Sequence, residues 1–507
     1  GFAIKDFGVI DEKLRNKIID NFRNYDYNKF LFNKNSPHKK LTFNDLKDPS
    51  RKNLNFLRSK LADEVIQTAK ENSDKRLFYL EAPTGGGKTN LSLGIATELL
   101  EADTTLNKIF YVFPFTTLIT QSFDSIKETL ELNSAEIIQL HSKSGFHSKA
   151  ENDENVDGVY GNLKENYLSN LFINYPITLL SHIKFFNILK GNSKDNNYIL
   201  HRLANSIVII DELQSYNPKH WDKVIFYLAN YAKHFNIRFV LMSATLPKID
   251  EILEESKGVF TRLVPKENRN QYFRNENFSG RVEFNFELFE TWKTPNSEEK
   301  REGYLKKLQA FVFRKSEEYA KKNNSKVRTI IEFIKKKSAS EFRQIVKENG
   351  FFKDYQIYLI SGEILAPRRK QIIDEIKDEK YQKVLLISTQ VVEAGVDIDM
   401  DLGFKDKSLI DSDEQLAGRV NRNASKKECK VYIFNFDREV AIYGKDERYK
   451  VTRESIGKEG YKSILKDKSF DDLYRLVNEK IIKRNLNPHE VGFDTYKEYF
   501  KNFKFKE

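Results

Sequence analysis

The residue pattern best suited to chemistry is a glycine-rich segment, APTGGGKT, at residues 82–89 of the 507-residue chain. Glycines at 85–87 would let backbone N–H groups turn toward phosphate oxygens with no Cβ in the way. Lys88 would then reach the β and γ oxygens of a nucleoside triphosphate, and the Thr89 hydroxyl would bind Mg²⁺. A chance glycine-rich turn is the alternative, but the segment follows an expected strand and opens an expected helix. The residues expected to bind ATP here are Thr84, Gly85, Gly86, Gly87, Lys88 and Thr89.

Two adjacent acids, Asp211 and Glu212, end the apolar run SIVII and form the second chemical signal. Successive side chains of an extended chain diverge, so the two acids can take different roles. Asp211 would hold Mg²⁺ through its water shell, and Glu212 would orient and polarise the attacking water. Alone, such acids often cap a following helix. Together with the upstream phosphate loop they predict ATP hydrolysis.

Two further segments carry small hydroxyl side chains and arginines. Ser243 and Thr245, in LMSATLP, could hydrogen-bond the two carboxylates, although alone they are more typical of a turn at a strand end. Arg419 and Arg422, in QLAGRVNR, lie three residues apart and would share one face of a helix. Opposite a nucleotide they would stabilise charge on the transferred phosphoryl group. The alternative is a solvated stripe on the helix surface.

The elements that must position these residues are continuous apolar runs, which are typical of strands buried on both faces of a parallel sheet. Stretches with helical spacing, such as residues 90–102 and 367–377, lie between them. Two consecutive series of this kind predict two doubly wound α/β domains, joined within residues 266–326. The expected strands are 76–82, 108–115, 136–142, 176–181, 206–212 and 238–245, then 328–334, 356–361, 383–389 and 430–436.

Composition bounds the partners and the compartment. Lys and Arg number 85 against 74 Asp and Glu, which gives a formal net charge of +11. This excess suits a polyanionic partner, although a solvated lysine-rich surface is the alternative. No apolar run approaches the roughly 18 residues of a membrane helix, and the first residues contain no secretory apolar core. A single cysteine, Cys429, cannot form an internal disulfide. We therefore expect a cytoplasmic location and no membrane partner.

The order of the phosphate loop, the DE pair, the SAT segment and the Q-x-x-G-R-x-x-R segment resembles that of superfamily-2 helicases. More narrowly, the chain resembles the helicase part of the CRISPR-associated helicase–nuclease of type I systems, over roughly residues 50–440. This resemblance implies two tandem RecA-like domains with parallel sheets that hydrolyse ATP with Mg²⁺. It also implies movement along single-stranded DNA, generally 3′ to 5′, after recruitment by an RNA-guided surveillance complex. The segments that carry the narrower resemblance are YVFPFTTLITQ (111–121), QLHS (139–142), DELQ (211–214), STQVVEAGVDID (388–399) and EQLAGRVNR (414–422).

Residue by residue, the resemblance assigns four groups of positions. Asn55–Arg58 is a candidate for adenine recognition or an ordinary helix start. The ATPase positions are Lys88, Thr89, Asp211, Glu212, Gln415, Arg419 and Arg422, and Gly395 and Asp397 couple nucleotide to nucleic acid. Strand-contact positions are Phe115, Thr116 and Thr117 in the first domain and Thr389 with Gln390 in the second.

The chain also departs from that family. There is no His-Asp dipeptide, and the closest histidine pair, His141 and His147, lies in a polar stretch. We therefore expect no metal-dependent nuclease site, and an HD nuclease that is a separate polypeptide or was removed upstream of Gly1. No role is assigned to Glu332.

The sequence-based division of the chain has four parts. Residues 1–50 form an N-terminal extension, 51–265 the ATP-binding RecA-like domain, 266–440 the second RecA-like domain and 441–507 a short basic C-terminal segment. The expected function is an ATP-dependent single-stranded DNA translocase or helicase of a type I CRISPR system. The alternatives are a superfamily-2 RNA helicase and an ATP-gated clamp that scaffolds a nuclease.

Overall fold

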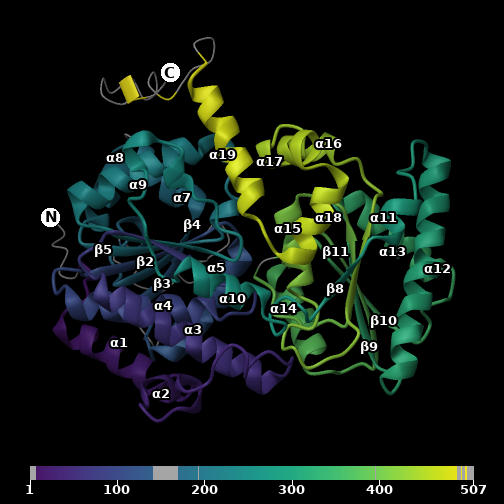
Figure 1. Ribbon diagram of the computed structural model, residues 1–507, viewed down its shortest axis with the longest axis horizontal. Coiled ribbons are helices and arrows are strands. Elements are labelled where there is room, and N and C mark those ends of the chain that lie inside the picture. The colour runs from purple at the N-terminus through teal and green to yellow at the C-terminus, as the bar shows by residue number, and fades with distance from the viewer. Residues whose placement is uncertain are drawn as a thin grey trace, which may run out of the picture. The chain divides into compact units, whose positions relative to one another are not determined.

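The computed structural model describes residues 7–140, 169–191, 193–393, 395–487, 493 and 497–498. The chain forms two compact units (Figure 1). Each unit is made of stretches that are not consecutive in the sequence, and both ends of the sequence belong to unit 1. Unit 1 comprises Gly1–Leu41, Phe56–Asn270 and Tyr474–Glu507, and unit 2 comprises Thr42–Asn55 and Gln271–Leu473.

Unit 1 is built on a seven-stranded parallel sheet in the order β3-β4-β2-β5-β6-β1-β7. Its central strands β1, β2, β5 and β6 are buried along their whole length, as continuous apolar runs require. Figure 1 shows α3 and α4 on one side of this sheet and α7, α8 and α9 on the other. The strands are β1 (Leu77–Glu81), β2 (Lys108–Phe113), β3 (Ile137–Leu140), β4 (Ile177–Ser181), β5 (Ser206–Asp211), β6 (Arg238–Ser243) and β7 (Thr261–Arg262).

Three of the described α-helices of unit 1 precede β1, and the others lie between or after its strands, as in other doubly wound folds. Helices α3, α10 and α19 each include residues of both units. The helices are α1 (Glu12–Asn24), α2 (Asp26–Phe32), α3 (Arg51–Glu71), α4 (Lys88–Ala102), α5 (Thr116–Thr129), α7 (His182–Lys190), α8 (Lys194–Leu200), α9 (Trp221–Phe235), α10 (Lys266–Arg274) and α19 (Asp471–Asn485).

Unit 2 is built on a six-stranded parallel sheet in the order β10-β11-β9-β12-β13-β8. The strands are β8 (Glu283–Asn285), β9 (Val327–Glu332), β10 (Gln356–Ile360), β11 (Lys383–Ser388), β12 (Leu402–Asp406) and β13 (Lys430–Phe434). The helices are α11 (Glu287–Thr291), α12 (Glu298–Lys322), α13 (Lys336–Glu348), α14 (Ala366–Lys377), α15 (Ile410–Ala417), α16 (Val440–Tyr443), α17 (Glu447–Val451) and α18 (Gly457–Asp467).

The predicted fold class, α/β with two parallel sheets, is confirmed, and each of the ten expected strands is present. The sequence analysis missed β7 and β8, which are too short to form an apolar run, and β8 lies inside the stretch predicted as a junction. It also missed β12, because Lys405 and Asp406 give this strand a polar sequence although both side chains are buried. None of the described helices is long and apolar enough to cross a membrane.

Lys108, the first residue of β2, is buried and holds the N-terminal segment of unit 1 in place. Its ammonium group donates hydrogen bonds to the carbonyls of Phe7 (3.1 Å), Gly8 (2.7 Å), Ile173 (3.1 Å) and Tyr175 (2.9 Å). A buried cation is tolerated only where such acceptors replace its hydration shell. The ammonium therefore links two segments far apart in the sequence.

We predict that Lys108→Met lowers the free energy of unfolding of unit 1 by about 2–4 kcal/mol, because the buried carbonyls lose their shared donor. Urea unfolding followed by circular dichroism measures this change. Lys75→Met is the matched control, since that side chain is 55% exposed, and it should change stability little. Equal effects of the two substitutions would contradict the assignment.

Candidate active site

Three neighbouring strands of unit 1 bring the predicted ATP-handling residues to one edge of the sheet. β1 pairs with β6, and β6 pairs with β5, all in parallel. The phosphate loop follows β1, the acid pair ends β5, and Ser243 ends β6. Because the carboxyl ends of parallel strands meet at one edge, these segments lie together, where ligands bind in open α/β sheets.

The phosphate loop has the backbone that an anion cradle requires. Gly85 and Gly87 adopt left-handed conformations, with φ of 83° and 84°. A Cβ at Gly86 would lie 2.9 Å from the Pro83 carbonyl oxygen. Gly87 is the N-cap of α4, so the free N–H groups and positive dipole end of this 15-residue helix face the loop. The residues present therefore fit the phosphates of a nucleotide.

Lys88 forms an ion pair with Glu212 and lies 3.7 Å from a carboxylate oxygen of Asp211. The other oxygen of Glu212 accepts hydrogen bonds from the Gln214 amide (2.5 Å) and the Ser243 hydroxyl (3.3 Å). The phosphate-loop lysine and the DE pair, which lie far apart in the sequence, are thus in direct contact. Donors on both sides fix the Glu212 carboxylate.

The two acids differ in their affinity for protons. Burial raises the pKa of Asp211 to about 7; Lys88 opposes this shift, and the Glu212 charge adds to it. Burial alone would raise the pKa of Glu212, but Lys88 and the hydrogen bonds from Gln214 and Ser243 lower it. Glu212 is therefore the stronger acid of the pair and stays ionised, as a group that polarises water must.

Of the two residues expected to hydrogen-bond the carboxylates, Ser243 contacts Glu212, whereas Thr245 contacts Ser243. The Ser243 hydroxyl also donates to the Gln214 side-chain oxygen, and the Thr245 backbone N–H donates to the Ser243 hydroxyl at 3.0 Å. Tyr474, in α19, donates to the Thr245 hydroxyl at 3.3 Å. Sequence reasoning gave no role to Gln214, although it lies inside the DELQ segment, and no local signal points to Tyr474.

Arg58 contacts the phosphate loop directly. Its Nε donates to the Gly85 carbonyl oxygen at 2.7 Å, and the residue lies within α3 rather than at the helix start. Of the two readings of Asn55–Arg58, the ordinary helix start is therefore wrong. Adenine recognition stays a prediction, and Arg58 in addition orients the loop.

The prediction that Arg419 and Arg422 share a helix face is wrong. Helix α15 ends at Ala417, with Gly418 as its C-cap, so both arginines lie in the turn that follows. Asn421 adopts a left-handed conformation in this turn, with φ of 46°. Glycine is a common helix terminator, and the three-residue spacing therefore does not reflect helical periodicity.

Both arginines instead contact the loop after β11, which we call the 389–399 loop. Arg419 donates from Nε to the Val392 carbonyl at 3.1 Å and from Nη2 to the Glu393 carbonyl at 2.6 Å. Arg422 forms an ion pair with Asp397 at 3.0 Å. The structure of unit 2 thus brings together the two motifs STQVVEAGVDID and QLAGRVNR.

Asp397 also pairs with Lys377 of α14 at 2.8 Å. Burial alone would raise the pKa of Asp397, but Arg422 and Lys377 lower it. Gly395 adopts a left-handed conformation with φ of 70°, and the Gln415 side chain lies half-buried on α15. The 389–399 loop is therefore held by side chains from α14 and from the turn that follows α15.

The predicted strand-contact residues follow β2 in unit 1 and β11 in unit 2. Phe115 is 43% exposed, and Thr116 and Thr117 form the first turn of α5. Because β2 lies beside β5, this turn is at the same sheet edge as the acid pair. Thr389 is only 6% exposed, and the Gln390 amide donates to the Tyr443 hydroxyl. Nucleic-acid contact by Thr389 and Gln390 stays a prediction.

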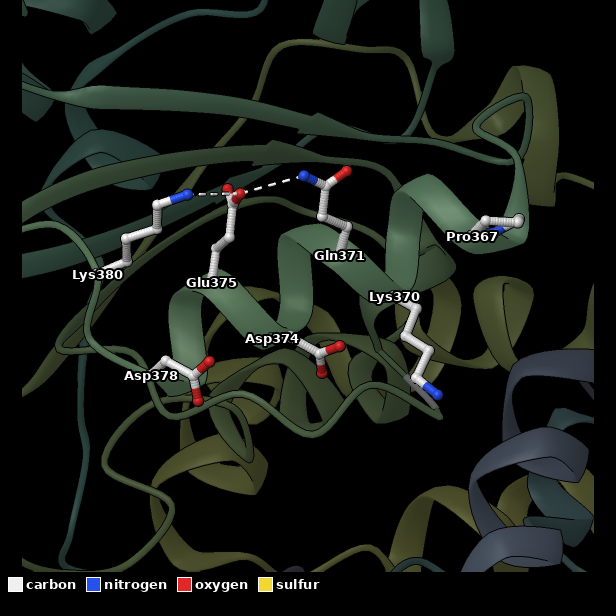
Figure 2. A pocket seen from close by; sticks show the side chains of 7 residues that line it. All are labelled: Pro367, Lys370, Gln371, Asp374, Glu375, Asp378 and Lys380. Carbon is white, nitrogen blue, oxygen red and sulfur yellow. Dashed lines mark hydrogen bonds and ion pairs between the residues drawn. The ribbon is translucent and has the colours of Figure 1, made fainter.

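A separate hollow of about 630 Å³ lies along α14 in unit 2 (Figure 2). Glu375 accepts hydrogen bonds there from Gln371 (3.3 Å) and Lys380 (3.0 Å). None of the predicted site residues lines it. Across the described part of the chain, His, Cys, Asp and Glu side chains nowhere gather in threes that could hold a metal ion, and His141 and His147 lie outside that part.

Each unit contains a region that matches the model of a known protein family. The DEAD/DEAH box helicase family matches residues 59–252, and the C-terminal region of the CRISPR-associated nuclease/helicase Cas3 matches residues 323–425. The first match covers the phosphate loop and the acid pair. The second covers the 389–399 loop and the arginines.

Individual relatives agree with these matches. A CRISPR-associated nuclease/helicase Cas3 of Methanothermobacter thermautotrophicus is 23% identical over 377 residues, which cover 71% of this chain and 40% of that protein. A protein of the same designation from Methanocaldococcus jannaschii is 24% identical over 376 residues, which cover 72% of this chain and 47% of the relative. The chain therefore spans less than half the length of either relative.

The crystal structure of T. fusca Cas3-ATP is similar in fold, with a TM-score of 0.57 and 16% sequence identity, over 86% of this chain and 53% of that one. At this identity the likeness supports the fold alone. It matches tandem RecA-like domains, each with a parallel sheet. The two family matches, in their observed order, support a Cas3-type superfamily-2 helicase.

Proposed function

We propose that the chain is an ATP-driven translocase of single-stranded DNA, moving 3′ to 5′, in type I CRISPR interference. The observation that carries this proposal is the contact of Lys88 with Glu212 and Asp211 beside a glycine cradle. This arrangement holds a phosphate-binding cation and a water-polarising carboxylate at one sheet edge, as nucleotide hydrolysis requires.

The residues of unit 1 would act in a definite order. The phosphate-loop amides and the N-terminus of α4 bind the phosphates, and Lys88 moves from Glu212 to the phosphate oxygens. Glu212, still held by Gln214 and Ser243, then orients and polarises the attacking water. When bound, Mg²⁺ neutralises phosphate charge beside Thr89 and Asp211.

Unit 2 would supply positive charge to the transferred phosphoryl group. Arg419 and Arg422 are fixed on the 389–399 loop by carbonyls and by Asp397. An arginine stabilises the charge that develops on the phosphoryl oxygens. Gln415, which lies on α15 shortly before these arginines in the sequence, would contact the same nucleotide.

The strand would be bound mainly through its phosphates, without base reading, as suits a motor that moves along any sequence. Supporting observations are the net charge of +11 and the exposed Phe115 beside Thr116 and Thr117 at the sheet edge that holds the acid pair. Phe115 offers a ring on which a base can stack.

The names of the two archaeal relatives, which combine nuclease and helicase, support a role in CRISPR interference. We propose that an RNA-guided type I surveillance complex recruits the motor in the cytoplasm. We further propose that cutting is done by an HD nuclease, either a separate polypeptide or a part of the protein upstream of Gly1.

Displacement of streptavidin from end-biotinylated oligonucleotides tests the motor. With ATP and Mg²⁺, we expect displacement from the 5′ end of single-stranded DNA, little from the 3′ end, and intact DNA when Mn²⁺ is added. RNA as the better stimulator of ATP hydrolysis would favour an RNA helicase. Hydrolysis without displacement would favour an ATP-gated clamp, and Mn²⁺-dependent cutting would contradict the separate nuclease.

We predict that Glu212→Gln lowers ATP turnover by a factor on the order of 10²–10⁴, because an amide cannot polarise water as a carboxylate does. ATP affinity, measured by fluorescence titration, should stay within about threefold of wild type, since Lys88 and the loop amides supply the phosphate contacts. Lys88→Ala should instead weaken ATP binding itself.

Glu254→Gln is the matched control for the acid, since that side chain is 82% exposed in unit 1. It should leave turnover unchanged. A near wild-type rate in Glu212→Gln would show that the acid pair has been misassigned.

We predict that Arg422→Ala leaves single-strand binding nearly intact but lowers the DNA-stimulated ATPase rate by a factor on the order of 10³. The substitution removes the positive charge that would stabilise the transferred phosphoryl group. Fluorescence anisotropy and a coupled ATPase assay measure the two quantities. Arg314→Ala, at a side chain 60% exposed on α12, is the control and should change neither. A wild-type DNA-stimulated ATPase rate in both Arg419→Ala and Arg422→Ala would contradict the role assigned to these arginines.

A further inference from the structure

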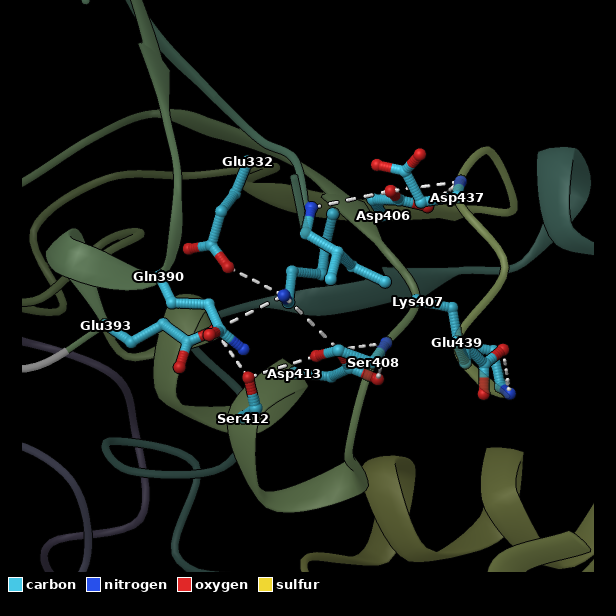
Figure 3. Close-up of polar contacts among 12 residues, drawn as sticks. Glu332, Gln390, Glu393, Asp406, Lys407, Ser408, Ser412, Asp413, Asp437 and Glu439 are labelled. Carbon is cyan, nitrogen blue, oxygen red and sulfur yellow. Dashed lines mark hydrogen bonds and ion pairs between the residues drawn. The ribbon is translucent and has the colours of Figure 1, made fainter. Parts of the chain in front are cut away.

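Lys405 of β12 is fully buried, and three carboxylates converge on its ammonium group. Figure 3 labels the residues that carry these carboxylates, Glu332, Glu393 and Asp413. Lys405 Nζ lies 2.6 Å from Glu332 Oε1, 3.2 Å from Glu393 Oε1 and 3.7 Å from Asp413 Oδ1. Glu332 ends β9, Glu393 belongs to the 389–399 loop, and Asp413 lies on α15. We call these four residues the Lys405 cluster.

The cluster joins the segments that carry the arginines. The side chain of Glu393 points to Lys405, while its backbone carbonyl accepts the 2.6 Å hydrogen bond from Arg419. Asp413 lies on α15 two residues before Gln415. A single ammonium group therefore ties both the 389–399 loop and α15 to the sheet of unit 2.

The neighbours of the cluster restrict its carboxylates further. Ser412 donates to Glu393, and Asp413 accepts from the Tyr461 hydroxyl (2.7 Å) and the Ser408 hydroxyl (2.9 Å). Among the described residues, Glu393 and Asp413 are thus each held by a second contact besides Lys405, whereas Glu332 is not. This leaves Glu332 as the least supported member.

The charges of the cluster do not balance if all three carboxylates are ionised, because one ammonium faces three negative groups inside a buried site. Glu332 Oε2 is buried, and with all three carboxylates ionised none of the described residues donates a hydrogen bond to it. A proton on Glu393 would supply that donor and remove one charge. In agreement, burial and the Glu332 charge raise the pKa of Glu393 well above its usual range.

We propose that Lys405 and Glu332 are positioning residues for Arg419. The ammonium group fixes the Glu393 side chain, and the loop backbone then presents the Val392 and Glu393 carbonyls that orient Arg419. Neither residue lies in the phosphate loop, the acid pair or the strand-contact segments. The proposal rests on the proposed role of the arginines in ATP hydrolysis.

The first test compares Lys405→Met with Lys407→Met. Lys407 lies two residues further along and pairs with Glu439 at 2.6 Å, outside the cluster. In Lys405→Met we expect the DNA-stimulated kcat to fall more than tenfold while KM for ATP changes less than threefold, because the phosphate-binding residues of unit 1 are untouched. Lys407→Met should lower kcat less than threefold. A folded Lys405→Met protein with kcat within threefold of wild type would overturn the proposal.

A second pair of variants remains informative if Lys405→Met does not fold. In Glu332→Gln the amide oxygen can still accept from Lys405 and the amide nitrogen can donate to Glu393, so kcat should stay within twofold of wild type. Glu332→Leu offers neither contact, and kcat should fall about three- to tenfold with KM unchanged. Equal kcat values for the two variants would overturn the proposal.

Hydrogen–deuterium exchange of the nucleotide-free protein separates this proposal from the proposed function, since it needs no activity. Amides of residues 389–399 should exchange at least threefold faster in Glu332→Leu than in Glu332→Gln, whether or not the wild type hydrolyses ATP. Unchanged exchange would overturn the positioning role. Faster exchange together with a wild type that hydrolyses no ATP would contradict the proposed function instead.

Discussion

Unit 1 depends on one constraint: two adjacent buried carboxylates, Asp211 and Glu212, must share a compensating cation. An unpaired buried charge costs several kcal/mol, so the parallel sheet can end in two acids only where a lysine reaches them. Lys88 fulfils this condition from the neighbouring strand-loop-helix segment. The same ammonium group is the one that a phosphate would attract, so nucleotide binding competes with an internal ion pair.

This competition gives a physical reason for the surrounding hydrogen bonds. When Lys88 turns to phosphate, Glu212 loses its ion pair and must be held by other donors. Gln214 and Ser243 already contact its second oxygen. Unit 2 shows a related arrangement, in which Lys405 compensates three buried carboxylates and so fixes the loop that orients Arg419. In both units a lysine, half-buried Lys88 or fully buried Lys405, sets the position of the charged groups around it.

The sequence predicted the sheets well, and with them the meeting of the phosphate loop and the acid pair at one sheet edge, because both rest on local patterns. Apolar runs mark strands buried on both faces, and parallel strands necessarily place the segments at residues 82–89, 211–214 and 243–245 at one edge. Strand β12 escaped detection because Lys405 is buried through ion pairs and Asp406 through hydrogen bonds from backbone N–H groups, which a hydropathy pattern cannot show. The helix expected for Arg419 and Arg422 was wrong because Gly418 ends α15 before them. The contact of Tyr474 with Thr245 joins residues far apart in sequence, so no local pattern could indicate it.

The most direct test of the account is a crystal structure of the protein with Mg²⁺ and a non-hydrolysable ATP analogue. The account predicts that Lys88 Nζ leaves Glu212 and contacts the β and γ phosphate oxygens. It also predicts that Glu212 keeps its hydrogen bonds from Gln214 and Ser243. A structure in which the analogue is bound while Lys88 remains paired with Glu212, or in which the phosphates lie away from residues 84–89, would contradict it.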